Sequence, residues 1–226
     1  MSVWGHVGYA LAWISFGLLH SLLAHPSVNR AAARFAGPAT RLVYNLIAAL
    51  HLVGILLIGQ WLVGGSGRFE LPLWLHVTMW TMAALGVVLL LAGLREYNLD
   101  RFLGTWQLRR GIGASEDEPE EPLVTTGLHA YVRHPLYSGG FLLLWGIAQS
   151  PLGLATAVWG SLYLLIGTWL EERKLLRIYE EDYRAYRARV PAFVPWKGRA
   201  IPKPPKRERS KRQNGSRPAK RTKQDR

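Results

Sequence analysis

Ionisable and small residues gather at the start of one apolar stretch of the chain. Arg133 and His134 stand directly before Pro135, and Gly139 and Gly140 follow one helical turn later. Pro135 fits the first turn of a helix, because its missing amide hydrogen would have no partner there. The free amides of that turn and the helix dipole favour an anionic group. We interpret this segment as a helix start that binds an anionic ligand; the alternative is that Arg133 and His134 only anchor the helix at lipid headgroups.

Two adjacent carboxylates, Glu171 and Glu172, follow another apolar stretch. Carboxylates beside an apolar membrane helix usually face a cavity or a partner, although a water-solvated interfacial turn is the simpler alternative. If the two apolar stretches form an antiparallel hairpin through a turn at residues 150–153, their far ends meet. The sequence therefore predicts that both carboxylates approach Arg133 and His134 in one pocket.

The composition limits which other groups can take part. The chain has no cysteine, which excludes disulfides, thiolate metal sites and a cysteine nucleophile. Residues 197–226 hold 13 Lys and Arg against 2 Asp and Glu, so they carry +11 of the net charge of +13. We expect this basic tail to be disordered and to bind anionic lipid, with nucleic-acid binding a less favoured alternative.

Five apolar stretches approach or reach the length of about 20 residues that crosses a bilayer. They run over 3–24, 42–64, 73–94, 136–150 and 152–170. The fourth is the shortest, and Pro135 and Pro151 bracket it. No Lys or Arg precedes the first stretch, unlike a signal peptide. We therefore predict an all-α, multi-pass integral membrane bundle of five transmembrane helices.

Basic residues in the loops predict the orientation of these spans. The first and third loops are rich in arginine, whereas the second has only Arg68, and the fourth and the N-terminus have none. This pattern places the N-terminus outside and the C-terminus in the cytosol. We expect a membrane domain over residues 1–196, ending in a cytosolic amphipathic helix over 171–189. The acidic run at 116–121 is interpreted as a solvated linker.

The ordered combination of motifs in the last third of the chain resembles the isoprenylcysteine carboxyl methyltransferase and phospholipid methyltransferase superfamily. The matching segments are Thr126-Gly127, Val132-Arg133-His134-Pro135-Leu136-Tyr137-Ser138-Gly139, Glu171-Glu172-Arg173-Lys174-Leu175, Tyr183, Tyr186, Val190-Pro191 and Pro195. Residues 16–24, 41–45 and 100–107 look more weakly like the branch of methanethiol S-methyltransferases and NnrU-like membrane proteins.

The resemblance implies S-adenosylmethionine as cofactor and a thiol or other lipophilic small molecule as substrate, with no metal. It implies Arg133 and Glu172 as catalytic residues, Arg133 orienting either the acceptor or the cofactor carboxylate. Glu171 or Glu172 would bind the amino group or the ribose hydroxyls. The cofactor-binding set that it implies is His129, Tyr131, Val132, His134, Leu136, Tyr137, Gly139, Glu171 and Glu172.

Two other functions compete with this interpretation. The five-residue spacing of His20 and His25, and of His129 and His134, resembles the histidine boxes of membrane di-iron enzymes, but too few histidines remain for such a site. An NnrU-like membrane protein that keeps the fold without methyl transfer is the main alternative. The methyl acceptor and the oligomeric state are not specified by the sequence.

Overall fold

The computed structural model describes residues 3–111 and 122–197, which form helices and no strands. The helices are α1 (Val3–Ala24), α2 (Pro26–Ala36), α3 (Thr40–Val63), α4 (Leu73–Leu94), α5 (Leu99–Leu103), α6 (Thr105–Arg110), α7 (Pro135–Gly146) and α8 (Pro151–Arg189). Short 3-10 turns are η1 (Gly37–Ala39), η2 (Gly64–Ser66) and η3 (Gly127–Ala130). The predicted acidic linker and, beyond Lys197, the predicted basic tail lie outside the described residues.

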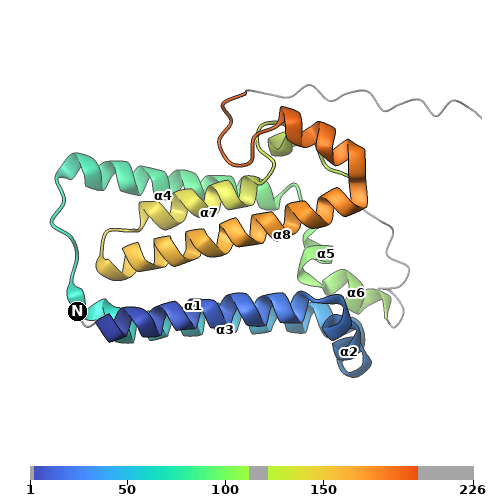
Figure 1. Cartoon of the computed structure of the whole chain (residues 1–226), viewed down its shortest axis with the longest axis horizontal. Coiled ribbons are helices and arrows are strands. Elements are labelled where there is room, and N and C mark those ends of the chain that lie inside the picture. Colours follow the sequence, from blue (N-terminus) through green and yellow to red (C-terminus); the bar gives the residue numbers. More distant parts are fainter. Residues whose placement is uncertain (1–2, 112–121, 198–226) are drawn as a thin grey trace, which may run out of the picture.

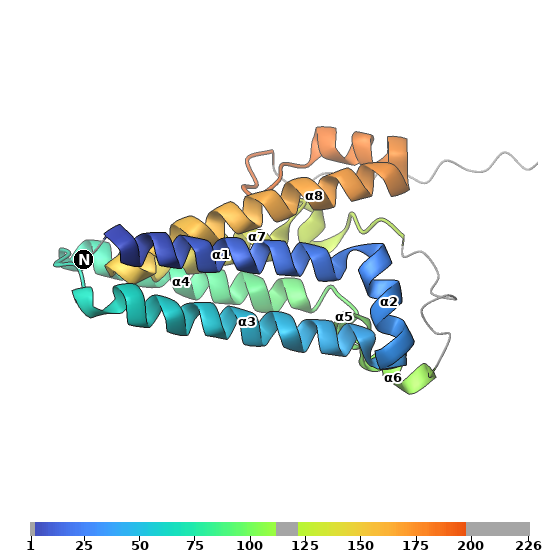
Figure 2. The same ribbon diagram turned by 60° about the horizontal axis from the view of Figure 1, so that its bottom comes forward.

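The five longest elements lie side by side along one axis, as Figures 1 and 2 show. Helices α1 and α3 form one antiparallel pair, α4 and α7 form another, and α8 contacts α1, α3 and α7. Four helical stretches are long and apolar enough to cross a membrane: Val3–Ala24, Ser27–Val63, Leu73–Leu94 and Pro151–Arg189. The predicted all-α membrane bundle is thus confirmed with four candidate spans.

The remaining predicted span corresponds to α7, which covers 12 residues and ends at Gly146 instead of Ser150. At 1.5 Å per residue it is about 18 Å long, less than the roughly 30 Å hydrocarbon core. Beyond it, the Gln149 carbonyl accepts a hydrogen bond from the Phe69 amide (3.0 Å), and the Gln149 side chain contacts His76 Nδ1 (2.7 Å). Polar contacts therefore replace helix in this segment, and a count of five spans stays a prediction.

Helices α4 and α7 pack through small residues. A Cβ atom on Gly86 would lie 2.5 Å from the backbone nitrogen of Leu143, and one on Gly139 would lie 2.9 Å from the carbonyl oxygen of Gly86. A Cβ atom on Gly146 would collide with the backbone of Ala83. Small residues let two membrane helices approach at backbone distance. This contact fixes where α7 starts, and hence where Arg133 and His134 lie.

Helix α8 runs well beyond its apolar part, but it is not straight. Glu180 has φ 42° and ψ −112°, a left-handed conformation unusual for a residue with a side chain, and the helix bends there. The last part of α8 folds back over the end of the bundle (Figure 1). Tyr183, Tyr186 and Val190 form a small buried core there. The expected amphipathic helix over 171–189 is therefore helical up to Arg189 but divided by a bend at Glu180, and its cytosolic location stays a prediction.

The segment between α4 and α7 contains ordered structure at both of its ends. Helix α5 contacts the start of α3, where the Asn45 side-chain amide donates to the carbonyls of Phe102 (2.9 Å) and Leu103 (3.2 Å). The turn η3 precedes the Arg133 segment. The segment between α4 and α7 thus contacts the α1–α3 pair through α5 and leads into α7 through η3.

Replacing Gly86 with alanine should force α4 and α7 apart, because the colliding atoms are backbone. Overpacking of this kind costs about 1–3 kcal/mol. We expect the thermal unfolding midpoint of Gly86→Ala in detergent to fall, as measured by loss of helical circular dichroism. The control is Gly54→Ala in α3, whose Cβ atom would meet nothing within 4 Å. Equal midpoints for the two variants would refute the close α4–α7 contact.

Candidate active site

The segment that leads into α7 is hydrogen-bonded to the residues that follow α8. The amides of Arg133 and His134 donate to the carbonyls of Pro191 (2.9 Å) and Ala192 (3.1 Å). The Ser138 hydroxyl donates to the His134 carbonyl (3.0 Å) and lies 2.9 Å from the carbonyl of Phe193. The fold-back of α8 at Glu180 makes these contacts possible. Residues far apart in sequence therefore fix the backbone of the Arg-His-Pro segment.

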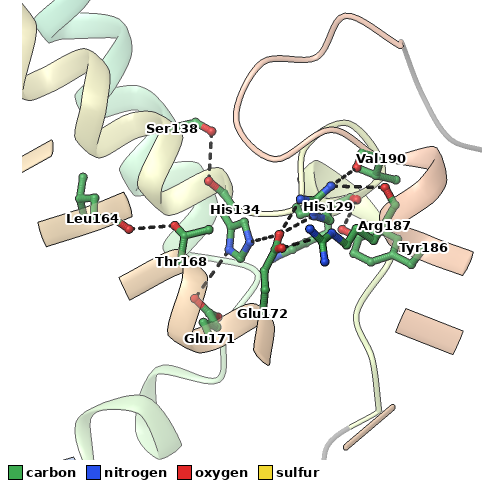
Figure 3. Close-up of polar contacts among 11 residues, drawn as sticks. His129, His134, Ser138, Leu164, Thr168, Glu171, Glu172, Tyr186, Arg187 and Val190 are labelled. Atoms are coloured by element: carbon green, nitrogen blue, oxygen red, sulfur yellow. Dashed lines mark hydrogen bonds and ion pairs between the residues drawn. The ribbon is translucent and has the colours of Figure 1, made fainter. Parts of the chain in front are cut away.

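A buried ion pair joins Arg133, two residues before α7, to Glu172 on α8. Figure 3 shows Glu172 with His134 and Arg187 beside it. Arg133 Nε donates to Glu172 Oε1 (2.8 Å), and Nη2 donates to the same oxygen. Both side chains are 10% exposed. Arg133 Nη1 donates to the carbonyl of Val190 (2.6 Å), and Arg187 Nε lies 3.4 Å from Glu172 Oε2. Arg133 and Glu172 therefore lie together, as the sequence predicted. Both side chains are bound by groups of the protein itself.

His134 lies between the two carboxylates. Its Nε2 is 3.2 Å from Glu172 Oε1, and its Nδ1 is 3.6 Å from Glu171 Oε2. Burial disfavours a charged imidazole, but hydrogen bonds and charges from Glu171 and Glu172 outweigh it and raise the pKa of His134. The ring stacks on Tyr137 with centroids 5.5 Å apart and planes 8° apart. His134 therefore presents a flat, paired aromatic surface next to two negative groups.

The two glutamates have different surroundings. Burial disfavours the charged form of Glu172, but hydrogen bonds from His134 and Arg133 and the charges of Arg133 and Arg187 lower its pKa to about 2. Glu171 has a side chain that is 41% exposed and is ion-paired only with His134, at 3.6 Å, among the described residues. Helix α7 also begins without a side-chain cap. Glu171 and the start of α7 are thus the polar groups best able to meet a ligand.

The other predicted cofactor residues are dispersed around this cluster. Tyr131 is 40% exposed, and Val132 is buried. Leu136 and Gly139 face α4, where Leu136 contacts Gly93 and the space beside Gly139 is filled by the α4 backbone. These positions support the helix contact, and their role toward a cofactor stays a prediction.

His129 belongs to a second ion pair that the sequence did not predict. Its Nδ1 lies 2.8 Å from Glu96 Oε2, while Glu96 Oε1 accepts from the Leu128 amide (2.6 Å). The Tyr186 hydroxyl donates to the His129 carbonyl (2.7 Å). Three residues therefore support the site in a way that the sequence did not predict: Glu96, Tyr186 and Arg187. The signal available was the family motif around Tyr186; nothing local marked Glu96 as a partner.

The cluster offers carboxylates, a histidine and an aromatic pair, but no metal centre. Within residues 3–111 and 122–197, no three His, Cys, Asp or Glu side chains gather closely enough to hold a metal ion. Charge neutralisation is instead supplied by arginine. The arrangement suits binding and alignment of a polar ligand rather than attack by a protein nucleophile.

Comparisons with known proteins match both the motifs and most of the chain. The family model described as phospholipid methyltransferase matches residues 113–182. No solved structure matched the chain. The curated methanethiol S-methyltransferase 1 of Bradyrhizobium diazoefficiens is 31% identical over 186 residues, which cover 80% of this chain and 64% of that protein.

Further relatives agree with this assignment. The methanethiol S-methyltransferase of Crocosphaera subtropica is 31% identical over 192 residues, which cover 81% of this chain and 72% of that protein. The protein-S-isoprenylcysteine O-methyltransferase of Schizosaccharomyces pombe is 36% identical over 90 residues, covering 37% of each chain. The resemblance seen in the sequence is confirmed. The chain therefore belongs to the methyltransferase family that includes phospholipid methyltransferases and methanethiol S-methyltransferases.

Proposed function

We propose that this chain is a multi-pass membrane methyltransferase that uses S-adenosylmethionine and acts on a small thiol or another lipophilic acceptor. Family membership and the apolar helices support this proposal. The observation that carries it is the half-exposed Glu171 carboxylate beside the stacked His134 and Tyr137 rings, at a helix start without a side-chain cap. These groups match a ligand that combines an ammonium, a carboxylate, hydroxyls and a flat base.

Each part of the cofactor has a chemically suitable partner in this cluster. Glu171 would accept hydrogen bonds from the amino group or the ribose hydroxyls. The amides at the start of α7 would favour the carboxylate. When bound, the cofactor supplies an electrophilic methyl group on a sulfonium. The protein's contribution is to align the acceptor with that group and to exclude water, which accelerates such displacements without a protein nucleophile.

We propose different roles for the two glutamates. Glu172 is neutralised by Arg133, Arg187 and His134, so it would act as a positioning residue that keeps the end of the chain against α7. Arg133 would act in the same way, because its Nη1 is committed to the Val190 carbonyl. Glu171 would contact the cofactor. The sequence left the division of roles between the two glutamates open, and the resemblance implied Arg133 and Glu172 as catalytic residues.

The proposed topology has five crossings, with the N-terminus outside and the end of α8 in the cytosol. The loop arginines support this orientation. Residues 1–196 would form the membrane domain, and the basic segment that follows would bind anionic lipid. An NnrU-like protein without transfer activity is the competing function. Cofactor binding without methyl transfer to any thiol or lipid would favour it.

Replacing Glu171 with glutamine should weaken S-adenosylmethionine binding about 10- to 100-fold, because a hydrogen bond to a charged group contributes about 1.5–3 kcal/mol. Binding is measured by calorimetry on the purified protein in detergent. The thermal unfolding midpoint should fall less than in Glu172→Gln, since the Glu171 side chain is 41% exposed and that of Glu172 only 10%.

The matched control is Glu181→Gln on the same helix, where exposed Arg184 is the ion-pair partner of the carboxylate within the described part of the chain. Its cofactor affinity should be unchanged. Equal affinities for both variants would contradict the role of Glu171, and no binding by the unsubstituted protein would contradict the proposed function.

Replacing Glu172 with glutamine should instead lower stability in a pH-dependent way. The folded-state pKa of about 2 lies below the ordinary value of 4.5, so ionised Glu172 stabilises the fold above about pH 4.5. That contribution is lost as the pH falls from 4.5 toward 2. The unfolding midpoint of Glu172→Gln should therefore be lower at pH 7, and the difference should narrow below pH 4.5. A difference that is constant with pH would show that the ion pair is not its source.

A further inference from the structure

A group of histidine and hydroxyl side chains lies inside the apolar helices and has no part in the function proposed above. The Tyr44 hydroxyl on α3 is 2.7 Å from His20 Nε2 on α1. The Phe16 ring stacks on His20, with centroids 5.6 Å apart. Ionisable residues within membrane helices are costly and generally mark a functional site. The His20–Tyr44 pair is therefore a candidate for chemistry rather than for packing alone.

This pair faces the same helix that carries the cofactor carboxylate. The ring of His20 meets the ring of Tyr163 on α8 edge-on, with centroids 5.9 Å apart. Tyr163, Gly167 and Glu171 are spaced four residues apart, so they lie along one face of α8. Figure 2 shows α1 running alongside α8. One face of α8 thus leads from His20 to Glu171 over two turns, about 12 Å of helix rise.

Gly167 keeps the middle of this face free of a side chain. The nearest atom to a Cβ built there is the Tyr137 hydroxyl oxygen, at 3.7 Å, which is an ordinary contact distance. Tyr137 also stacks on His134. We call this side-chain-free position on α8 the Gly167 strip. On one side of it lies Tyr163, which contacts His20. On the other side lies Tyr137, which stacks on His134.

We propose that the acceptor thiol of the proposed function binds at this Gly167 strip, and that the His20–Tyr44 pair receives its proton. The inference rests on the proposed function. The acceptor sulfur forms a bond to the methyl carbon as the bond from that carbon to the donor sulfur breaks, and the electron pair stays on the donor sulfur. The thiol proton goes to the His20 imidazole, directly or by exchange through the Tyr44 hydroxyl.

A thiol acceptor explains why a proton acceptor would be needed here. A thiolate is the nucleophilic form of a thiol, so an uncharged thiol arriving from the membrane needs a proton acceptor. Neutral imidazole is the side chain best suited to that role near neutral pH. Aromatic rings bound the strip on both sides, and the side-chain-free position between them favours a short alkyl group over a long one.

Substitution of Gly167 tests where the acceptor binds. In Gly167→Leu we expect the KM for ethanethiol to rise at least about tenfold and the affinity for ethanethiol, measured with S-adenosylhomocysteine bound, to fall equally. Cofactor affinity should change less than about twofold. Gly54→Leu in α3, with nothing within 4 Å of its Cβ position, is the matched control and should change neither.

Gly167→Ala adds a smaller group that the 3.7 Å contact accommodates. If Gly167→Leu loses cofactor binding as well, Gly167→Ala becomes the test of the acceptor site. Gly167→Ala should keep its cofactor affinity and still have a higher KM for ethanethiol. An unchanged KM in a variant that binds cofactor overturns the acceptor site but leaves the proposed function standing. Absence of cofactor binding by the unsubstituted protein would overturn the function itself.

Substitution of His20 tests proton transfer. For His20→Gln we expect kcat/KM for ethanethiol to fall about 100-fold near pH 7 and to recover as the pH rises. The more acidic 2,2,2-trifluoroethanethiol, which has the same carbon skeleton but a bulkier end group, should lose much less relative to its own rate with the unsubstituted protein. His51→Gln is the control, since His51 contacts Ser15 at 3.2 Å on the same helices and has no assigned role in transfer. Equal losses on both thiols, or no loss, would overturn the assignment of His20.

Discussion

The ion pair between Arg133 and Glu172 is the contact on which this end of the protein depends. Both side chains are largely buried, and an arginine stays charged at any ordinary pH. Leaving one buried partner unpaired typically costs about 3–5 kcal/mol. The pair must therefore persist whenever α7 and α8 are together. Because Arg133 also binds the Val190 carbonyl, the same charge holds the returning chain in place.

The Arg133–Glu172 ion pair can form only because the packing of α7 against α4 places the start of α7 correctly. Between α4 and α7 the glycine positions bring backbone against backbone, which is specific in register but contributes no charge. At the other side of the Arg-His-Pro segment, Glu96, two residues beyond the end of α4, binds the Leu128 amide and His129. Helix α4 and the residues that follow it thus support the candidate site at both of these positions, although none of them belongs to the predicted site.

Hydropathy and local chemistry in the sequence predicted much of this arrangement. The lengths of the apolar stretches predicted the bounds of α1 and α4. Pro135 and the short hairpin turn predicted that Arg133 would meet Glu172. All of these are local signals. The bend at Glu180 has no Gly or Pro to mark it, so the return of Tyr186 and Val190 could not be predicted. The Glu96–His129 pair joins residues 33 apart, and no local pattern encodes such a partner. The division of roles that we propose for Glu171 and Glu172 likewise rests on the positions of Arg133 and Arg187.

The shortness of α7 has a consequence for how the chain changes sides of the bilayer. Its first turn lies level with Gly93 at one end of α4, and Gly146 lies level with Ala83, about halfway along. Residues 147–149 then cover the remaining distance to His76 without helix, and Ala148 and Gln149 are buried against protein rather than lipid. Irregular backbone at membrane depth is tolerated only in such shelter. A proposed fifth crossing therefore needs no fifth full-length helix, and tallies of membrane passes based on helix length would undercount proteins built in this way.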